Sequence, residues 1–431
     1  MIARIPFPRF ISFPKVVDLF TPLLFLYFVT LHADQLNFQF GGTIRFNNLL
    51  ALGLLIVLMV RLRKDLFKID KWLTISLSAI IFSVLISMFF TPYFHRCLLF
   101  ACWFFWTLLC YFWLPYQMVI KLDSKRILHL YFTSFLVVGA YGFSQLITGP
   151  LGDPFVGQYI TSFIGRPNAF SYEPSYYVLY MTPFVIYQTC LFLNGDKAVS
   201  GKRMCIIYLF YLSSMSAGAI ASLMVFFSMI LFHKKMRKNA ALFLFKIAIA
   251  LSPLFILMPS VAMNFLLKNG QLNAHFSATD RINGMLDCLA LFKKRPLIGY
   301  GLGAVAPVRV HQESFQEKYN VPEGANLLKA AEPTNISSEV LASLGLVGGA
   351  AFCLMILVFV ITYIKNRKNY KHDALLIAFF VMLINWQFNQ SLMRPYCWTF
   401  FAIAAALLKT NLQSGLSPSQ EESGQMLDTA F

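Results

Sequence analysis

Charged residues are scarce in this chain. Only 13% of its 431 residues are charged and 58% are hydrophobic, whereas about a quarter of the residues in a soluble globular protein are charged. Long apolar runs with few charges are typical of helices that cross a lipid bilayer. The composition therefore excludes an ordinary soluble domain and predicts an all-α polytopic membrane protein.

Acidic residues are scarcer still, with 19 Asp and Glu against 36 Lys and Arg, for a net charge of +17. The basic residues stand in short clusters between apolar runs, as the positive-inside rule requires of cytoplasmic loops. A basic patch for nucleic acid would gather on one soluble face instead. Membrane lipid is thus an expected partner, and nucleic acid is not.

The cysteines do not predict a disulfide framework. The eight cysteines are scattered singly, mostly inside apolar runs. That pattern indicates neither paired disulfides nor the closely spaced ligands of a metal site. We expect no metal and no other cofactor, and we interpret the cysteines as small apolar side chains.

The apolar runs predict about 12 transmembrane helices, and the basic clusters place both termini in the cytoplasm. The first run has no small-residue cleavage site after it, so we interpret it as an uncleaved span. The predicted spans cover residues 16–31, 48–60, 73–90, 97–119, 127–147, 174–193, a pair between 204 and 233, 240–261, 336–364, 374–388 and 396–408.

The pair between residues 204 and 233 is an inference from length. About 30 apolar residues are too many for one relaxed span at about 1.5 Å per residue, and basic clusters flank both ends. If both flanks are cytoplasmic, the stretch forms a hairpin of two short helices that turns near 213–218, close to the outer face. The alternative is one long tilted helix with a basic cluster outside.

The spans divide the chain into four parts. Residues 1–260 form a membrane bundle with spans 1 to 9, and residues 261–335 form one long extracytoplasmic loop. Residues 336–410 hold spans 10 to 12. The polar, acidic residues 411–431 are expected to be a disordered cytoplasmic tail.

The long loop begins with a predicted amphipathic helix. Thr279 or Asp280 can cap a helix that runs to about Lys294. Arg281 and Cys288 fall on one face of it, together with further apolar side chains. We expect this helix to rest on the membrane surface.

Three glycines follow that helix. Pro296 stops the helix, and Gly299, Gly301 and Gly303 allow a close-fitting turn against a ligand or another backbone. A flexible loop is the alternative. No strand precedes the glycines, which excludes a dinucleotide-binding fold.

Two further features of this region carry open alternatives. His311 is the only histidine between the glycines and the next span, so it is a candidate base or an inert part of a solvated face. In the tenth span, small residues at Ser338, Ala342, Gly345 and Gly349 predict the close approach of another helix.

A second polar stretch lies between the fifth and sixth spans. It reads G-R-P-N-A-F-S-Y-E-P-S-Y-Y and places Arg166, Tyr172 and Glu173 at the outer membrane boundary. A local ion pair and an interfacial aromatic belt are the alternatives. An arginine, a carboxylate and aromatic rings are also what a phosphate-linked sugar needs for binding.

In this order the motifs resemble a known family. The block D-R…P-L-I-G-Y-G-L-G, the entry T-N…L-G-L-V-G-G and the R-P-N-A-F-S-Y-E-P-S passage are similar to the O-antigen polymerase and O-antigen ligase superfamily of bacterial polysaccharide assembly. The resemblance implies a metal-independent glycosyltransferase of the bacterial cytoplasmic (inner) membrane. Its donor would be a glycan on polyprenyl diphosphate at the outer leaflet.

The resemblance also assigns roles. Arg281 matches the loop arginine that engages the donor diphosphate, and Asn335 matches the asparagine of the ligases' His-Asn pair. Thr334 replaces the ligase histidine, and Ala217 replaces an arginine common in the family, which favours polymerase over ligase. The resulting candidates are Glu173 and Arg281 as catalytic residues and Arg166, Tyr172, Gly299, Gly301, Gly303, Asn335 and His311 as substrate-binding residues.

Other functions stay open. A ligase would transfer the finished glycan to a different acceptor, whereas a polymerase would use another lipid-linked repeat unit. The alternative from a different class is a flippase or transporter, which places ionisable residues or broken helices within the membrane. A chain-length regulator and a flippase are candidate protein partners of the polymerase.

Overall fold

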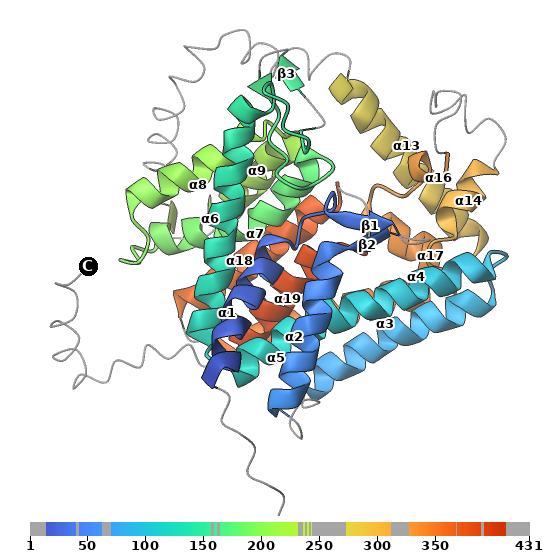
Figure 1. The fold of residues 1–431 in the computed structure, drawn as a ribbon. Coiled ribbons are helices and arrows are strands. Elements are labelled where there is room, and N and C mark those ends of the chain that lie inside the picture. The colour runs from blue at the N-terminus through green and yellow to red at the C-terminus, as the bar shows by residue number, and fades with distance from the viewer. Residues whose placement is uncertain are drawn as a thin grey trace, which may run out of the picture.

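The structure is a computed structural model. It describes residues 14–39, 43–62, 70–156, 159–161, 164–231, 236–237, 239–240, 243, 273–311, 327–367, 369–388 and 392–410. These residues form a bundle of helices with two short hairpins, as Figure 1 shows. The mostly helical architecture confirms the predicted helical class.

Helices lie over eleven of the twelve predicted spans. They are α1 (Pro14–Val29), α2 (Phe46–Leu62), α3 (Lys71–Phe89), α4 (Phe94–Thr107) continued by the π-helix η1 (Leu108–Trp113) and α5 (Leu114–Lys121), α6 (Ser124–Thr148), α7 (Pro174–Leu193), α8 (Gly201–Ser213), α9 (Ala217–Leu231), α17 (Ile336–Asn366), α18 (Tyr370–Trp386) and α19 (Pro395–Leu407). The predicted ninth span and the tail fall largely outside the described residues.

Not every helix is long enough to cross a membrane by itself. Five candidate spans are long and apolar: α3, the continuous helix Phe94–Lys121, α6, α7 and α17. Four shorter apolar helices stand at Phe20–Val29, Phe46–Val60, Ala217–Leu231 and Pro395–Leu407. The chain is thus a multi-pass membrane protein, and the number of twelve spans stays a prediction.

The elements between the spans are short. The long loop contains α13 (Asn273–Lys294), α14 (Val305–Val310) and α16 (Leu327–Ala330). Strand β1 (Asn37–Gln39) pairs with β2 (Thr43–Arg45), and β3 (Tyr159–Thr161) pairs with β4 (Ile164–Gly165), both antiparallel. Helix α13 begins at Asn273, so the predicted start at Thr279 or Asp280 is wrong by about two turns.

Helices α7 and α19 form the protein-facing centre of the bundle. In α7, 94% of the most apolar window is buried inside the protein, against 39% in α3. The peripheral helices expose large apolar side chains such as Phe82, Leu99 and Met224. Lipid solvates such side chains as well as a protein core does, so the exposure fits a membrane bundle.

The hairpin prediction for residues 204–233 is confirmed. Helix α8 ends at Ser213 and α9 begins at Ala217, so two helices replace the one long tilted helix. The turn between them places Met215 at a φ of 47°. Its position relative to the outer face stays a prediction.

Polar contacts join segments that the topology places on the same side. At the end predicted to be cytoplasmic, Tyr370 donates to Asp196 at 2.9 Å, and Lys409 pairs with Asp70. At the other end, Gln35 donates to the Ser171 carbonyl oxygen at 2.7 Å. In Figure 1 β3 and α13 lie on the upper side, β1 and β2 lie near mid-height, and the lower end of α2 lies below them all.

Candidate functional site

The glycine turn docks against a break in α17. Gly345 has φ 65° and ψ −161°, which interrupts the helix. Tyr300 and Gly301 donate backbone N–H groups to the carbonyl oxygens of Ala342 and Ser343 at 2.9 and 2.8 Å, and Leu346 donates to Pro296 at 2.7 Å. The turn thus satisfies backbone groups that the break exposes, as burial in a membrane protein requires.

This docking bears on two predictions. The glycines were predicted to form either a close-fitting turn or a flexible loop, and they form a turn that fits closely against another backbone. The predicted close approach of a helix is confirmed at Ala342, which packs with Cys288 and Leu291 of α13. At Gly345 the approaching segment is the loop instead, because a Cβ there would overlap the Leu297 carbonyl group. The tenth predicted span is therefore a broken helix.

The three glycines are required by space as well as by φ. Gly299, Gly301 and Gly303 have φ values of 73°, 98° and 84°. A Cβ at Gly303 would lie 2.5 Å from the Phe100 ring, and one at Gly301 would lie 2.7 Å from the Cys97 sulfur. Packing between α4 and α17 explains all three glycines, and their predicted contact with substrate is untested.

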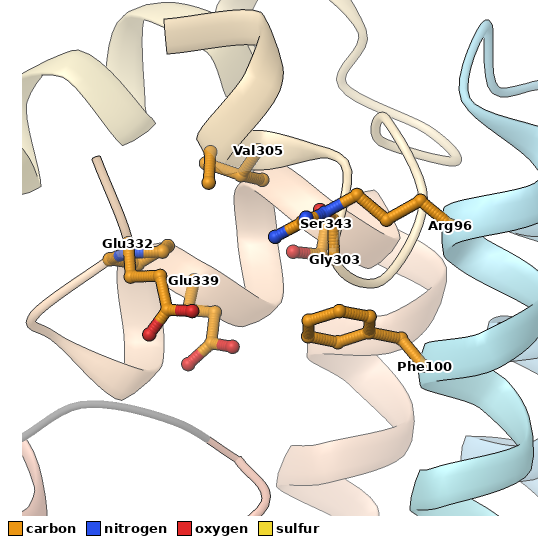
Figure 2. Close-up of a pocket in the computed structure, with 9 residues that line it drawn as sticks. Arg96, Phe100, Gly303, Val305, Glu332, Glu339 and Ser343 are labelled. Atoms are coloured by element: carbon orange, nitrogen blue, oxygen red, sulfur yellow. The ribbon is translucent and has the colours of Figure 1, made fainter. Parts of the chain in front are cut away.

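A pocket opens where the glycine turn, α4 and the start of α17 meet (Figure 2). Arg96 donates its Nε–H to the Gly303 carbonyl oxygen at 2.7 Å, and its guanidinium lies 5.0 Å from the Phe100 ring centre. The complete lining is Arg96, Phe100, Gly303, Val305, Ala306, Glu332, Pro333, Glu339 and Ser343.

Sequence reasoning missed this pocket, although one signal was present. Glu339 lies inside the predicted tenth span, and a carboxylate within a span is a functional hypothesis by default. Its side chain is 8% exposed, and its Oε2 accepts a hydrogen bond from the Leu392 N–H at 3.2 Å. The other carboxylate of the lining, Glu332, had no such signal because it lies in a loop.

Helix α13 is anchored by a buried ion pair. Arg309 of α14 is 1% exposed, and its Nη2 lies 3.4 Å from the Asp287 carboxylate. Its Nη1 also donates to the Ala331 carbonyl oxygen at 2.6 Å. Burial raises the pKa of the neighbouring Cys288 thiol to about 12, so that thiol is protonated at neutral pH.

The side of α13 that packs on the protein includes Cys288, which the sequence places on one face with Arg281. Gly284, Cys288 and Leu291 are buried, while Ile282 and Leu286 are about half exposed. Helix α17 supplies the packing partner. The exposed apolar residues fit the predicted rest on a membrane surface, which stays a prediction.

Arg281 lies one turn before Gly284, on the same side of α13. A Cβ at Gly284 would lie 3.5 Å from Thr334 Oγ1, so this side of the helix faces the Thr334-Asn335 pair. Arg281 is partly buried and makes no hydrogen bond or ion pair with the part of the chain that the structure describes. The donors of its guanidinium are therefore not used by another described element.

Asn335 has a structural task. It is the N-cap of α17, where its Oδ1 accepts the Ser338 N–H at 2.9 Å. Its Nδ2 donates to the Gln387 carbonyl oxygen at the end of α18, also at 2.9 Å. The hydroxyl oxygen of the neighbouring Thr334 has no hydrogen-bond partner among the described residues.

Arg166 reaches the turn between α8 and α9. Its Nε and Nη2 donate to the carbonyl oxygens of Ser214 and Met215 at 3.2 and 3.1 Å. Burial lowers the pKa of its guanidinium, and the nearby Glu173 charge partly offsets this shift. Arginine keeps its charge despite such a shift because its ordinary pKa is so high.

Glu173 and Tyr172 are exposed beside this arginine. Glu173 is the N-cap of α7 but makes no capping bond, and its Oε2 accepts the Ser175 hydroxyl at 3.1 Å. Tyr172 is 48% exposed, and its OH accepts the Asn37 side-chain N–H at 2.9 Å. Both side chains are thus accessible at the same loop.

A buried charge network lies next to this loop. Asp34 is 1% exposed and lies between two guanidinium groups, 2.9 Å from Arg394 Nη1 and 3.1 Å from Arg45 Nη2. The Arg394 guanidinium also lies 3.6 Å from the Tyr176 ring centre. The network holds the start of α19 against the segment after α1. Only the tertiary structure brings these three charges together.

His311 stands apart from the other candidates. It ends α14, and its Nδ1 donates to the Pro307 carbonyl oxygen at 2.7 Å. In the neutral ring, Nε2 is then the acceptor. Its ring packs beside Tyr93, 6.1 Å between centres. The structure gives no contact between His311 and Arg281, Arg166 or Glu173.

Three candidates are linked through the outer end of α18. Arg166 holds the turn before α9, and a Cβ at Gly218 in that helix would lie 3.4 Å from Asn385. Two residues later, Gln387 binds Asn335, which adjoins the side of α13 that carries Arg281. A series of contacts thus leads from Arg166 through α9 and α18 to Asn335, and Glu173 lies near Arg166.

Comparison with known families gives one match. Residues 204–353 match the O-antigen ligase family model. This match confirms the resemblance to the O-antigen polymerase and ligase superfamily. The O-antigen ligase region contains Arg281, the glycine turn and Asn335, whereas Arg166, Tyr172 and Glu173 precede it. No curated protein matches the chain.

The apolar helices make the chain a multi-pass membrane protein, and its residues 204–353 are similar to the O-antigen ligase family. The family suggests a glycosyltransferase-like enzyme and polyprenyl-linked glycan substrates.

Proposed function

We propose that the protein is a polysaccharide polymerase. It joins oligosaccharide repeat units carried on polyprenyl diphosphate into a surface polysaccharide, which is an O-antigen, a capsule or an exopolysaccharide. The reaction takes place at the outer face of the bacterial cytoplasmic membrane. The observation that carries the proposal is the O-antigen ligase match, because its range holds Arg281, the glycine turn and Asn335.

Arginines suit the leaving group of this reaction. When the donor sugar is transferred, its bond to the diphosphate oxygen breaks and negative charge develops on that oxygen. A guanidinium matches this charge with a fork of donors. Arg281 has no described partner that competes for those donors, and Arg166 already places its guanidinium at the α8–α9 turn.

Glu173 suits the acceptor side. The new bond forms between the donor's anomeric carbon and an acceptor hydroxyl oxygen, whose proton must leave. Glu173 is exposed beside Arg166, and a carboxylate within reach of the hydroxyl can take that proton. Tyr172 offers an exposed ring to the sugar at the same loop.

Thr334 favours a polymerase over a ligase. A threonine hydroxyl is no base at neutral pH, so it cannot act in place of the histidine that ligases have there. Ala217 also replaces an arginine that is common in the family. Here Arg166 supplies a guanidinium to the turn that precedes Ala217. Another lipid-linked repeat unit is then the acceptor.

One observation favours the flippase alternative. Helix α17 is broken at Gly345, and broken helices are typical of transporters, where they occur in pairs around a substrate site. Within the described residues Gly345 is the only non-helical residue inside a helix. The break in α17 also has a local explanation, since the glycine turn docks there.

Complementation of a deletion strain tests the proposal. A polymerase restores a ladder of glycan lengths on a gel, and its loss leaves single lipid-linked units at the outer leaflet. A ligase would restore transfer of single units instead. Loss of a flippase would trap the units at the inner leaflet, and that outcome would refute the proposal.

A further inference from the structure

The pocket between α4, the glycine turn and α17 is separate from the residues proposed for chemistry. Its lining contains none of Arg281, Arg166 and Glu173. It is nevertheless built from the family-matched part of the chain on one side and from α4 on the other. The composition of its lining indicates which ligand it would accept.

Arg96 presents donors to this pocket. Its Nε–H is bound to the Gly303 carbonyl oxygen, which fixes the guanidinium over the Phe100 ring. Its two terminal nitrogens make no hydrogen bond to a described residue, and Figure 2 shows them directed toward the pocket. A fixed guanidinium with terminal N–H groups in a pocket can donate to a ligand oxygen.

Two carboxylates supply acceptors. Figure 2 shows the Glu332 and Glu339 carboxylates on the other side of the pocket from Arg96. The Leu392 N–H holds Glu339 in place. Hydrogen bonds to charged groups are the stronger ones, so each carboxylate is a good acceptor for a ligand hydroxyl.

The mixture of donors and acceptors in the lining decides the class of ligand. The lining offers N–H donors on Arg96 and acceptors on two carboxylates, and a diphosphate, whose oxygens only accept, cannot use those acceptors. A neutral sugar both donates and accepts through its hydroxyls, and its apolar ring face can lie against Phe100. We propose that this pocket binds a neutral sugar of the glycan by its hydroxyl groups. The inference rests on the proposed function, for which it names a sugar subsite apart from the diphosphate.

The pocket is small. The space open to the centre of a water molecule is about 40 Å³, and one water needs about 10–15 Å³ on this measure. A few hydroxyl groups therefore enter, while the remainder of the sugar stays at the open mouth. This geometry favours recognition of one hydroxyl-bearing edge.

The test uses the full-length protein in lipid nanodiscs, which contain no sugar detergent. The probes are the methyl glycosides of glucose, galactose, mannose and N-acetylglucosamine, with inorganic diphosphate as competitor. Saturation-transfer difference NMR measures binding. We expect at least one glycoside to bind, diphosphate not to displace it, and the signal to fall at least about fivefold in Glu332→Gln and Phe100→Leu.

The control is Phe94→Leu, an equivalent change at an exposed position of the same helix. It should bind like the wild type. Absence of glycoside binding, equal binding by Phe100→Leu and Phe94→Leu, or displacement by diphosphate would overturn the inference. Selective glycoside binding without a restored glycan ladder would support the sugar pocket and reject the polymerase.

Discussion

Gly299 of the glycine turn and Ser343 of α17 are in backbone contact: a Cβ at Gly299 would lie 2.5 Å from the carbonyl carbon of Ser343. Because φ at Gly299 is 73°, an alanine there would be strained even with free space. The contact holds the loop to the broken helix.

We therefore predict that Gly299→Ala lowers stability by more than the roughly 1–2 kcal/mol of backbone strain alone. The control is Gly195→Ala, where φ is 78° but nothing lies within 4 Å of the added Cβ. Thermal melting of the purified protein compares them. Equal melting temperatures for the two variants would mean that the backbone at Ser343 can move away from the added Cβ without loss of stability.

Arg281→Lys should be damaging although it keeps the charge. Lysine lacks the planar fork that matches a diphosphate. Loss of one such donor costs about a hundredfold to a thousandfold in rate. We expect the glycan ladder to disappear or shorten severely at normal protein level. Lys293→Arg, on the exposed end of the same helix, is the control. A normal ladder would leave Arg281 as a membrane anchor, where lysine serves as well.

Glu173→Gln should abolish or severely shorten the ladder without lowering the melting temperature. Its carboxylate is exposed and caps no helix N–H group, so glutamine leaves the fold intact while it removes the proton acceptor. Arg166→Ala should weaken the ladder too, but it also removes two bonds to the α8–α9 turn and should lower the melting temperature. A ladder of normal length from Glu173→Gln would exclude this carboxylate as the base.

The topology can be tested independently of the family. Single cysteines at His311 and Pro322 should react with an impermeant reagent in intact cells, whereas cysteines at Lys235 and Arg367 should react only after lysis. Pro322 and Lys235 lie outside the described residues. Labelling at His311 only after lysis would place the proposed site on the wrong side of the membrane.

His32 should make stability depend on pH. Burial lowers the pKa of this imidazole to about 3, although the Asp34 charge partly offsets the shift. The unfolded chain, with a pKa near 6.5, then binds a proton more readily than the folded protein does. Stability is therefore complete above pH 6.5 and falls as pH drops from there toward 3, by up to about 1.4 kcal/mol per pH unit.

The variant His32→Phe keeps a ring next to Tyr180, which His32 contacts at 4.5 Å between centres, and removes the titration. Its melting temperature should fall less between pH 7 and 5 than that of the wild type. His95→Phe changes an exposed imidazole and should retain the wild-type pH dependence. Identical pH profiles for the wild type and His32→Phe would contradict the assignment.

Composition and hydropathy are enough to predict the class and the positions of most helices. Apolar runs and basic clusters are local features, so they locate the break between two helices at 213–218 without tertiary information. Pro296 and the glycines that follow it locate the turn at Gly299–Gly303 in the same way. The family resemblance was also local, since it rested on short motifs. The O-antigen ligase match covers the motifs at residues 280–303 and 334–349 but not the passage at residues 166–175.

The contacts that these segments make depend on how distant parts of the chain pack together. The sequence predicts close helix packing at Gly345 rather than a break. Glycine is found both where two helices pack closely and where φ is positive, so the residue type alone does not distinguish the two. The pairing of Asp34 with Arg394 joins residues 360 positions apart, and Arg96 and Glu339 line one pocket because α4, the glycine turn and α17 come together there. A charged residue inside an apolar run predicts that a partner neutralises it. Which residue is the partner depends on how distant helices pack.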